Sequence, residues 1–222
     1  MWATCKGFWI MPGNKPWELK TPGRRPADTR ERRRVLIVCE DSKSACDYFK
    51  SFKIDSKRAE VFPFGIGMNT DGLVEEAIKF KGIAVKECQP YNEVWCVFDR
   101  DSFPLGNYIR AFELARANGI KVAWANEAFE LWYLLHFNYH VAGISRKQYK
   151  AKLKPNLEYD KADKTIYDQV KPFQATALKF ARKLERHWRD MGEKFPERQN
   201  PSTSVHKLVE FLNELVELGS MD

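Results

Sequence analysis

The segment EVWCVFDRDS, residues 93–102, passes from an apolar run directly into two carboxylates, Asp99 and Asp101. A continuous apolar run of this length predicts a strand buried on both faces, as in a parallel sheet. Open α/β sheets bind their ligands at the carboxyl ends of such strands. Two Asp residues at positions i and i+2 offer the hard oxygen ligands that Mg²⁺ and Mn²⁺ prefer. The alternative is a solvated turn in which one Asp caps a helix.

Two further predicted strands also end in acidic or amide side chains. Residues 35–39 are apolar and lead to Glu40, and residues 120–125 lead to Asn126 and Glu127. Because strands alternate with helices along the chain, we expect a parallel sheet whose carboxyl ends meet at one edge. Carboxylates from separate parts of the chain are therefore predicted to gather at that edge.

Glu130 lies in the otherwise apolar helical stretch 128–137. A Glu in a helix that is buried on nearly all sides is costly unless it is paired or binds a metal. We therefore interpret Glu130 as a functional residue rather than a surface residue. His136, in the same stretch, is interpreted as a satisfied core histidine, and the role of Glu127 stays open.

The remaining pattern completes an α/β fold. Residues 59–64 predict a strand, and Pro63 favours the edge of the sheet because proline cannot donate a ladder hydrogen bond. Helices are predicted over residues 71–88, 104–118, 128–137, 173–191 and 201–218. The predicted fold class is a Rossmann-like α/β core with a central parallel sheet flanked by helices, plus a helical C-terminal extension. The predicted divisions are an irregular basic arm (1–32), the core (33–140) and the extension packed on it (141–222).

The charge of +7 is unevenly distributed along the chain. Residues 1–34 carry a net +6 and residues 145–198 a net +7, whereas residues 35–144 and 199–222 each carry −3. An acidic centre that gathers metal, beside basic surfaces that gather phosphate, suits a metal-dependent enzyme acting on nucleic acid. Ordinary solvated charge is the alternative. The candidate nucleic-acid-binding residues are Arg24, Arg25, Arg32, Arg33, Arg34, Arg100, Lys147 and Lys150.

Composition also bears on location. The chain has no run of about 18 apolar residues, so we expect no contact with a membrane. Residues 1–13 lack the apolar core of a secretory signal. The five cysteines are odd in number and form no CxxC motif, which fits free thiols in a reducing cytoplasm. We therefore predict a cytoplasmic protein.

Four motifs resemble known proteins. A Glu after the first strand and an Asp-x-Asp after a later one resemble the Toprim domain, the metal-dependent phosphoryl-transfer domain of topoisomerases, bacterial primases and OLD nucleases. VCEDSKSA (38–45), FDRD (98–101), NEAFELWYLLHF (126–137) and NPST (200–203) together resemble the RloB family, which is linked to restriction loci and includes an abortive-infection protein. The first motif of that family usually reads CEGEKTE. In this chain Cys39, Glu40 and Lys43 fit that motif and Ser44 replaces its threonine, whereas Asp41, Ser42 and Ala45 depart from it.

The resemblance implies an endonuclease of the Toprim type that acts in anti-phage defence. Asp99 and Asp101 would hold Mg²⁺ or Mn²⁺, with Glu40 bridging to the metal or serving as general base. Glu130 would complete the ligand shell or bind a second metal. Lys43 would stabilise the charge that grows on the phosphate, together with Arg100.

Two other functions remain open from the sequence. One is a degenerate Toprim-fold module that binds nucleic acid or regulates a partner ATPase, which the missing carboxylate at Ala45 favours. The other is a nucleotidyl or other phosphoryl transferase that uses the same carboxylates. No feature of the sequence decides between DNA and RNA as the partner.

Overall fold

The computed structural model describes residues 32–57, 59–68, 70–100 and 104–217. The predicted site residues Arg24, Arg25 and Asp101 lie outside these ranges. Within them, no helix has the length and apolar character needed to cross a membrane.

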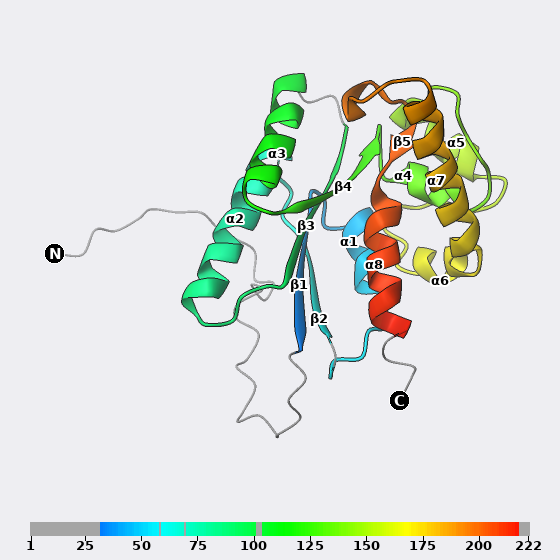
Figure 1. The fold of residues 1–222 in the computed structure, drawn as a ribbon. Coiled ribbons are helices and arrows are strands. Elements are labelled where there is room, and N and C mark those ends of the chain that lie inside the picture. Colours follow the sequence, from blue (N-terminus) through cyan, green and yellow to red (C-terminus); the bar gives the residue numbers. More distant parts are fainter. Residues whose placement is uncertain (1–31, 58, 69, 101–103, 218–222) are drawn as a thin grey trace.

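In the described part of the chain, five strands form one sheet in the order β2-β1-β3-β4-β5 (Figure 1). Strands β1 to β4 run parallel, and β5 pairs antiparallel with β4. Their bounds are β1 Arg33–Cys39, β2 Ala59–Gly65, β3 Glu93–Asp99, β4 Lys121–Asn126 and β5 Ser202–Thr203. The predicted α/β fold with its parallel sheet is confirmed.

The apolar runs of β1 and β3 form the centre of the sheet because each is covered on both faces. Residues 35–39 and 94–98 are buried throughout. Side chains alternate between the faces of a strand, so Val35 and Ile37 belong to the core on one face, and Leu36 and Val38 to the core on the other. The strand with Pro63 is β2, which lies at the edge of the sheet as predicted.

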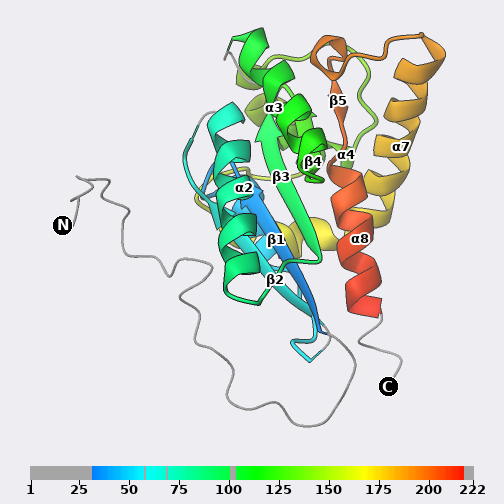
Figure 2. The same ribbon diagram turned by 60° about the vertical axis from the view of Figure 1, so that its left-hand side comes forward.

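Helices α2 (Thr70–Lys86) and α3 (Leu105–Ala117) cover one face of the sheet (Figures 1 and 2). They pack on a core that includes Leu73, Phe80 and Tyr108. The α3 helix ends before Gly119, whose φ of 61° gives the left-handed turn that glycine accepts without strain. Both helices follow their predicted ranges to within about two residues.

The other face carries the remaining helices (Figure 1). These are α1 Ser44–Lys50, α4 Glu130–Leu135, α5 Tyr149–Leu153, α6 Ile166–Val170, α7 Gln174–Asp190 and α8 Val205–Glu217. Short 3₁₀ turns occur at Arg146–Gln148, Lys171–Phe173 and Pro196–Arg198. A single apolar cluster joins residues of β1, α4, α7 and α8.

The extension is not wholly helical, which corrects one expectation. The final helix was predicted to open at Pro201, but it begins at Val205. Residues Ser202 and Thr203 instead form β5, whose partners in β4 are Asn126 and Ala125. The buried hydroxyl of Thr203 donates to the backbone oxygen of Trp124 at 2.8 Å. The C-terminal extension therefore supplies a strand to the sheet.

Candidate site at the carboxyl edge of the sheet

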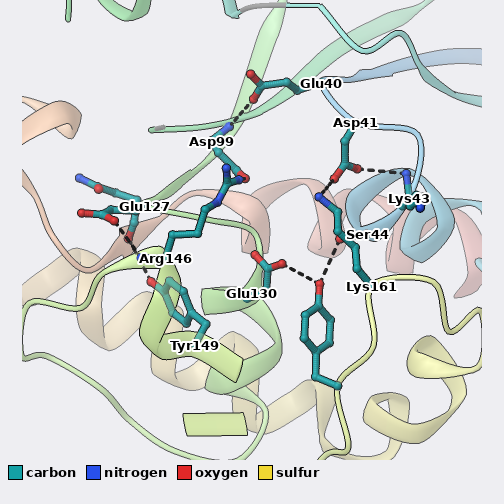
Figure 3. A network of polar contacts seen from close by, with 12 residues as sticks. Glu40, Asp41, Lys43, Ser44, Asp99, Glu127, Glu130, Arg146, Tyr149 and Lys161 are labelled. Atoms are coloured by element: carbon teal, nitrogen blue, oxygen red, sulfur yellow. Dashed lines mark hydrogen bonds and ion pairs between the residues drawn. The ribbon is translucent and has the colours of Figure 1, made fainter. Parts of the chain in front are cut away.

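Two of the predicted acidic residues meet directly at the carboxyl edge of the central strands (Figure 3). Glu40 follows β1, and Asp99 is the last residue of β3. The backbone N–H of Glu40 donates to the oxygen of Val97 at 2.9 Å, which extends the ladder between these strands. In return, Oε2 of Glu40 accepts the backbone N–H of Asp99 at 3.0 Å. The parallel register thus brings the side chain of Glu40 to the backbone of Asp99 across 59 residues of sequence.

A cavity of about 340 Å³ opens at this edge. Its wall combines carboxylates, two cationic side chains and apolar groups. The lining residues are Glu40, Asp41, Ala45, Gly67, Met68, Val97, Phe98, Asp99, Phe129, Arg146 and Lys161. Ala45, where the RloB motif has a glutamate, therefore lies on the cavity wall.

Asp99 is paired with a cation from the C-terminal extension. Nη2 of Arg146 lies 2.7 Å from Oδ2 of Asp99. The Asp99 side chain is 16% exposed and that of Arg146 is 43% exposed, so the pair spans the boundary between protein and solvent. Burial raises the pKa of Asp99 well above its usual range; Arg146 opposes this rise, and the charges of Glu130 and Glu40 add to it. A nearby cation therefore stabilises the ionised form of Asp99.

Asp41 has a cationic partner of its own. Nζ of Lys161 lies 2.5 Å from Oδ2 of Asp41. Burial lowers the pKa of Lys161, but its hydrogen bond to Asp41 and the charge of Asp41 outweigh this, and the pKa is raised overall. Oδ1 of Asp41 accepts the backbone N–H of Lys43, whose side chain is exposed and does not line the cavity.

Glu130 is held by a buried hydroxyl network. The hydroxyl of Tyr159 donates to Oε1 of Glu130 at 2.6 Å and lies 3.1 Å from Oγ of Ser44. The hydroxyl of Tyr133 donates to the backbone oxygen of Ser44 at 2.9 Å. Through this network Glu130 links the start of α4 to α1 and to the 157–161 segment. The charge of Glu130 also helps to raise the pKa of Asp99.

Glu127 positions the backbone that carries Arg146. Oε2 of Glu127 accepts the backbone N–H of Arg146 at 2.9 Å, and Oε1 accepts Nδ2 of Asn200 at 3.4 Å. Oδ1 of Asn200 accepts the backbone N–H of Ile144 at 3.2 Å. The buried amide of Asn126 donates to the backbone oxygen of Gln199 at 2.8 Å. The role left open for Glu127 in the sequence is therefore structural in this arrangement.

His136 is buried among aromatic rings, as expected of a core histidine, but it is not fully satisfied, because its buried Nε2 has no hydrogen-bond partner among the described residues. Its Nδ1 donates to the backbone oxygen of Trp132 at 2.8 Å. Tyr48 and Trp132 lie against the imidazole, with ring centroids at 6.5 and 5.0 Å. Burial lowers the pKa of His136 to about 4, so its ring is neutral at physiological pH.

The predicted phosphate-binding residues do not share one surface. Arg32 and Arg34 lie at the opposite end of β1 from Glu40, and both pair with Glu60, at 2.6 and 3.6 Å. The guanidinium of Arg34 also stacks on Tyr91, 4.9 Å from the ring centroid.

The other predicted phosphate-binding residues fall in three places. Arg33 is exposed in the first position of β1. Arg100 directly follows Asp99, and its guanidinium lies 5.5 Å from the ring centroid of Tyr108. Lys147 and Lys150 are exposed in the segment that follows Arg146.

The donor set fits a hard divalent cation by its chemistry. Carboxylate oxygens are the ligands that Mg²⁺ and Mn²⁺ prefer, and crowding of like charge around Asp99 is what such an ion relieves. As the side chains lie, no group of three His, Cys, Asp or Glu within the described ranges is close enough to hold a metal. The expected third ligand, Asp101, is outside those ranges.

Three side chains at the site were not predicted: Arg146, Lys161 and Tyr159. Each lies in the extension, and each contacts a predicted acidic region of the core. The basic run after Ser145 signalled cations in this region, but it offered several equivalent lysines and arginines. The sequence contains no signal that singles out Arg146 from its neighbours, because its place depends on the fold of the extension.

The fold and the site define an α/β protein with an acidic cavity at the carboxyl edge of a mostly parallel sheet. Residues 35–212 match the family model described as RloB-like protein. This match spans most of the chain, so the chain belongs to the RloB-like family, which confirms the resemblance drawn from the motifs. No curated protein and no solved structure gave a match.

Proposed function

We propose that this protein is a metal-dependent endonuclease of the Toprim type that hydrolyses nucleic-acid phosphodiesters in anti-phage defence. The observation that carries the proposal is the convergence of Glu40, Asp41 and Asp99 with Arg146 and Lys161 on one cavity. Carboxylates can bind a metal and cations can bind phosphate, which is the combination that metal-dependent phosphodiester hydrolysis uses. Family membership and the Asp-x-Asp sequence support the same conclusion.

Each side chain has a distinct role in this proposal. Asp99 and Glu40 would hold Mg²⁺ or Mn²⁺ together with Asp101, and Glu130 would complete the shell. The metal, when bound, supplies charge neutralisation and a more acidic water. Glu40 is oriented by the backbone N–H of Asp99 and would act as the general base toward that water. Arg146 and Lys161 would bind the phosphate oxygens. Lys43 and Arg100, which follow Asp41 and Asp99 closely in sequence, would assist them.

The test is cleavage by purified protein with Mg²⁺ or Mn²⁺ of supercoiled DNA, single-stranded DNA and total tRNA. We expect cleavage of one class by wild type, loss of cleavage with EDTA, and a loss of roughly 100-fold or more in Asp99→Asn, because a metal-binding charge disappears. Asp163→Asn is the matched control, since Asp163 does not line the cavity and its partners, Thr165 and Gln169, lie within six residues of it in sequence. Undiminished cleavage by folded Asp99→Asn would contradict the assignment.

A second candidate is a binding or regulatory module that acts with a partner ATPase. The ion pairs Arg146–Asp99 and Lys161–Asp41 favour it, because they already neutralise two carboxylates of the cavity. Ala45 favours it as well, since it leaves the cavity wall without the expected glutamate. Salt-sensitive binding of nucleic acid without cleavage, with either metal, would identify this function instead.

A further inference from the structure

The ion pair between Arg146 and Asp99 joins a residue of the extension to the end of the central strand β3 (Figure 3). In the proposed function Asp99 must also bind a divalent cation. A guanidinium at 2.7 Å from Oδ2 and a metal on the same carboxylate repel each other, and both compete for the same oxygen atoms. The position of Arg146 therefore bears directly on metal binding.

The backbone around Arg146 is fixed while its side chain reaches solvent. The N–H groups of Ile144 and Arg146 donate to Asn200 and Glu127 at 3.2 and 2.9 Å. The intervening Ser145 forms a capping box with Gln148, in which its N–H and hydroxyl both lie 2.9 Å from Oε1 of Gln148. The Arg146 side chain is 43% exposed, so its guanidinium can turn about its own torsions without movement of this backbone.

Rotation of the Arg146 side chain away from Asp99 would leave its guanidinium able to bind a phosphate in the same cavity. Phe98, Asp99 and Arg146 line the same cavity, so a guanidinium displaced from Asp99 stays beside any group bound there. Arginine presents several donors in a plane and pairs with phosphate as readily as with carboxylate. A phosphate bound next to the metal would thus replace the carboxylate as the partner of Arg146.

We propose that Arg146 is an exchangeable counter-ion: it pairs with Asp99 in the metal-free protein, yields Asp99 to the divalent cation, and then binds a phosphate oxygen of the nucleic acid. This proposal rests on the proposed function, since it assumes metal at Asp99. It goes beyond that function by naming the residue of the extension that couples metal binding to substrate binding. In both states Asp99 has a cationic partner: the guanidinium (+1) in the metal-free protein and the divalent cation (+2) in the metal-bound one, with the excess positive charge offset by the bound phosphate.

The first test is calorimetric titration of Mn²⁺ into wild type, Arg146→Gln, Arg146→Lys and Asp99→Asn at pH 7.5. Removal of the competing cation should raise Mn²⁺ affinity about tenfold in Arg146→Gln, in line with the strength of a partly buried charge pair. Arg146→Lys keeps the cation and should remain near wild type. Arg182→Gln is the matched control, because Nε of Arg182 pairs with Glu210 at 2.8 Å between α7 and α8.

The second test is binding of a 5′-phosphorylated trinucleotide, a product-like probe, with and without Mn²⁺. Wild type should bind the probe more tightly when Mn²⁺ is present, and Arg146→Gln should lose about tenfold of that affinity. Arg146→Lys should recover part of it. Retention of the full gain by Arg146→Gln would overturn the phosphate half of the proposal.

The outcomes separate this proposal from the proposed function. Mn²⁺ binding that depends on Asp99 but is unchanged or weaker in Arg146→Gln overturns the exchange and leaves the metal site standing. Mn²⁺ binding that is insensitive to Asp99→Asn, or absent from every variant, overturns the metal site and the exchange together.

Discussion

At the scale of the residue, the pKa of Asp99 is raised by burial and by the neighbouring carboxylates. If Asp99 binds a divalent cation as proposed, a proton would compete with that cation at a higher pH than it does at an exposed aspartate. Uptake of a metal at Asp99 would release a proton, and metal affinity would rise with pH until the carboxyl is ionised. The Arg146 guanidinium moderates this competition because it lowers the pKa of Asp99.

His136 gives a prediction about acid stability. Burial lowers its folded-state pKa to about 4, below the ordinary value of 6.5, so the unfolded chain binds a proton first as pH falls. The stability that the neutral ring contributes is complete above about pH 6.5 and is lost progressively toward pH 4, by about 3 kcal/mol for this one group. We expect His136→Phe to remove that portion of the acid-induced loss. Urea unfolding at pH 7 and pH 4 measures it.

The control for His136 is His140→Phe, since His140 is less buried and its pKa is lowered to a smaller extent. It should retain most of the wild-type acid loss. Equal pH dependence of unfolding in wild type and His136→Phe would contradict the burial of a neutral imidazole beneath α4.

The positions of the acidic site residues could be predicted where these residues lie at the end of a strand. Glu40 and Asp99 follow apolar runs, and a parallel sheet requires such ends to converge. Arg146 and Lys161 reach this cavity from short or irregular segments of the extension, and Tyr159 reaches the neighbouring Glu130; the three lie between 29 and 120 residues from their partners. Periodicity describes regular elements and gives no information about where a loop crosses the surface, so these three could not be placed.

At the scale of the element, the 144–146 segment behaves as a bracket between the core and the extension. Its backbone is held by the side chains of Glu127 and Asn200, which belong to two of the family motifs. The strands and longer helices were predictable from their periodicity. Strand β5 was not, because two residues are too few to show an alternating pattern.

Asn200→Ala should loosen this bracket. It removes an acceptor for the N–H of Ile144 and a donor to Glu127, and leaves partners unsatisfied, at a cost of about 1–2 kcal/mol in the free energy of unfolding. Amide hydrogen exchange should accelerate at residues 144–146 more than elsewhere. Asn118→Ala is the control, because the Asn118 side chain donates to the backbone oxygen of Leu114 in α3, far from residues 144–146. Unchanged exchange at 144–146 would rule out the bracket.

At the scale of the whole molecule, the core and the extension share one hydrophobic interior. The cluster that contains Val35 and Trp95 of the sheet also contains Leu184, Leu208 and Leu212 of the extension. A boundary at residue 140 therefore passes through a continuous packed region. Domains that share a core of this kind unfold as a single cooperative unit.

Leu212→Ala tests this unity. Leu212 is fully buried, and its truncation should lower the free energy of unfolding by about 2–5 kcal/mol. Tryptophan fluorescence and far-ultraviolet circular dichroism should report one shared transition in wild type and in the variant. Val85→Ala, at a position that is 58% exposed, should leave stability within about 0.5 kcal/mol. Two separate transitions would show that the extension folds independently.

The pairing of Asn200 with Glu127 and Ile144 has a consequence for synthesis of the chain. Asp99 is translated about 5 to 20 seconds before Asn200, at ordinary rates of ~5–20 residues per second. During this interval a nascent chain carries the acidic residues of the cavity but lacks the bracket that sets Arg146 against them. A prematurely terminated product would likewise contain the acidic sequence motifs without an assembled site. The site, including the ion pair between Arg146 and Asp99, can therefore assemble only after Asn200 has been synthesised.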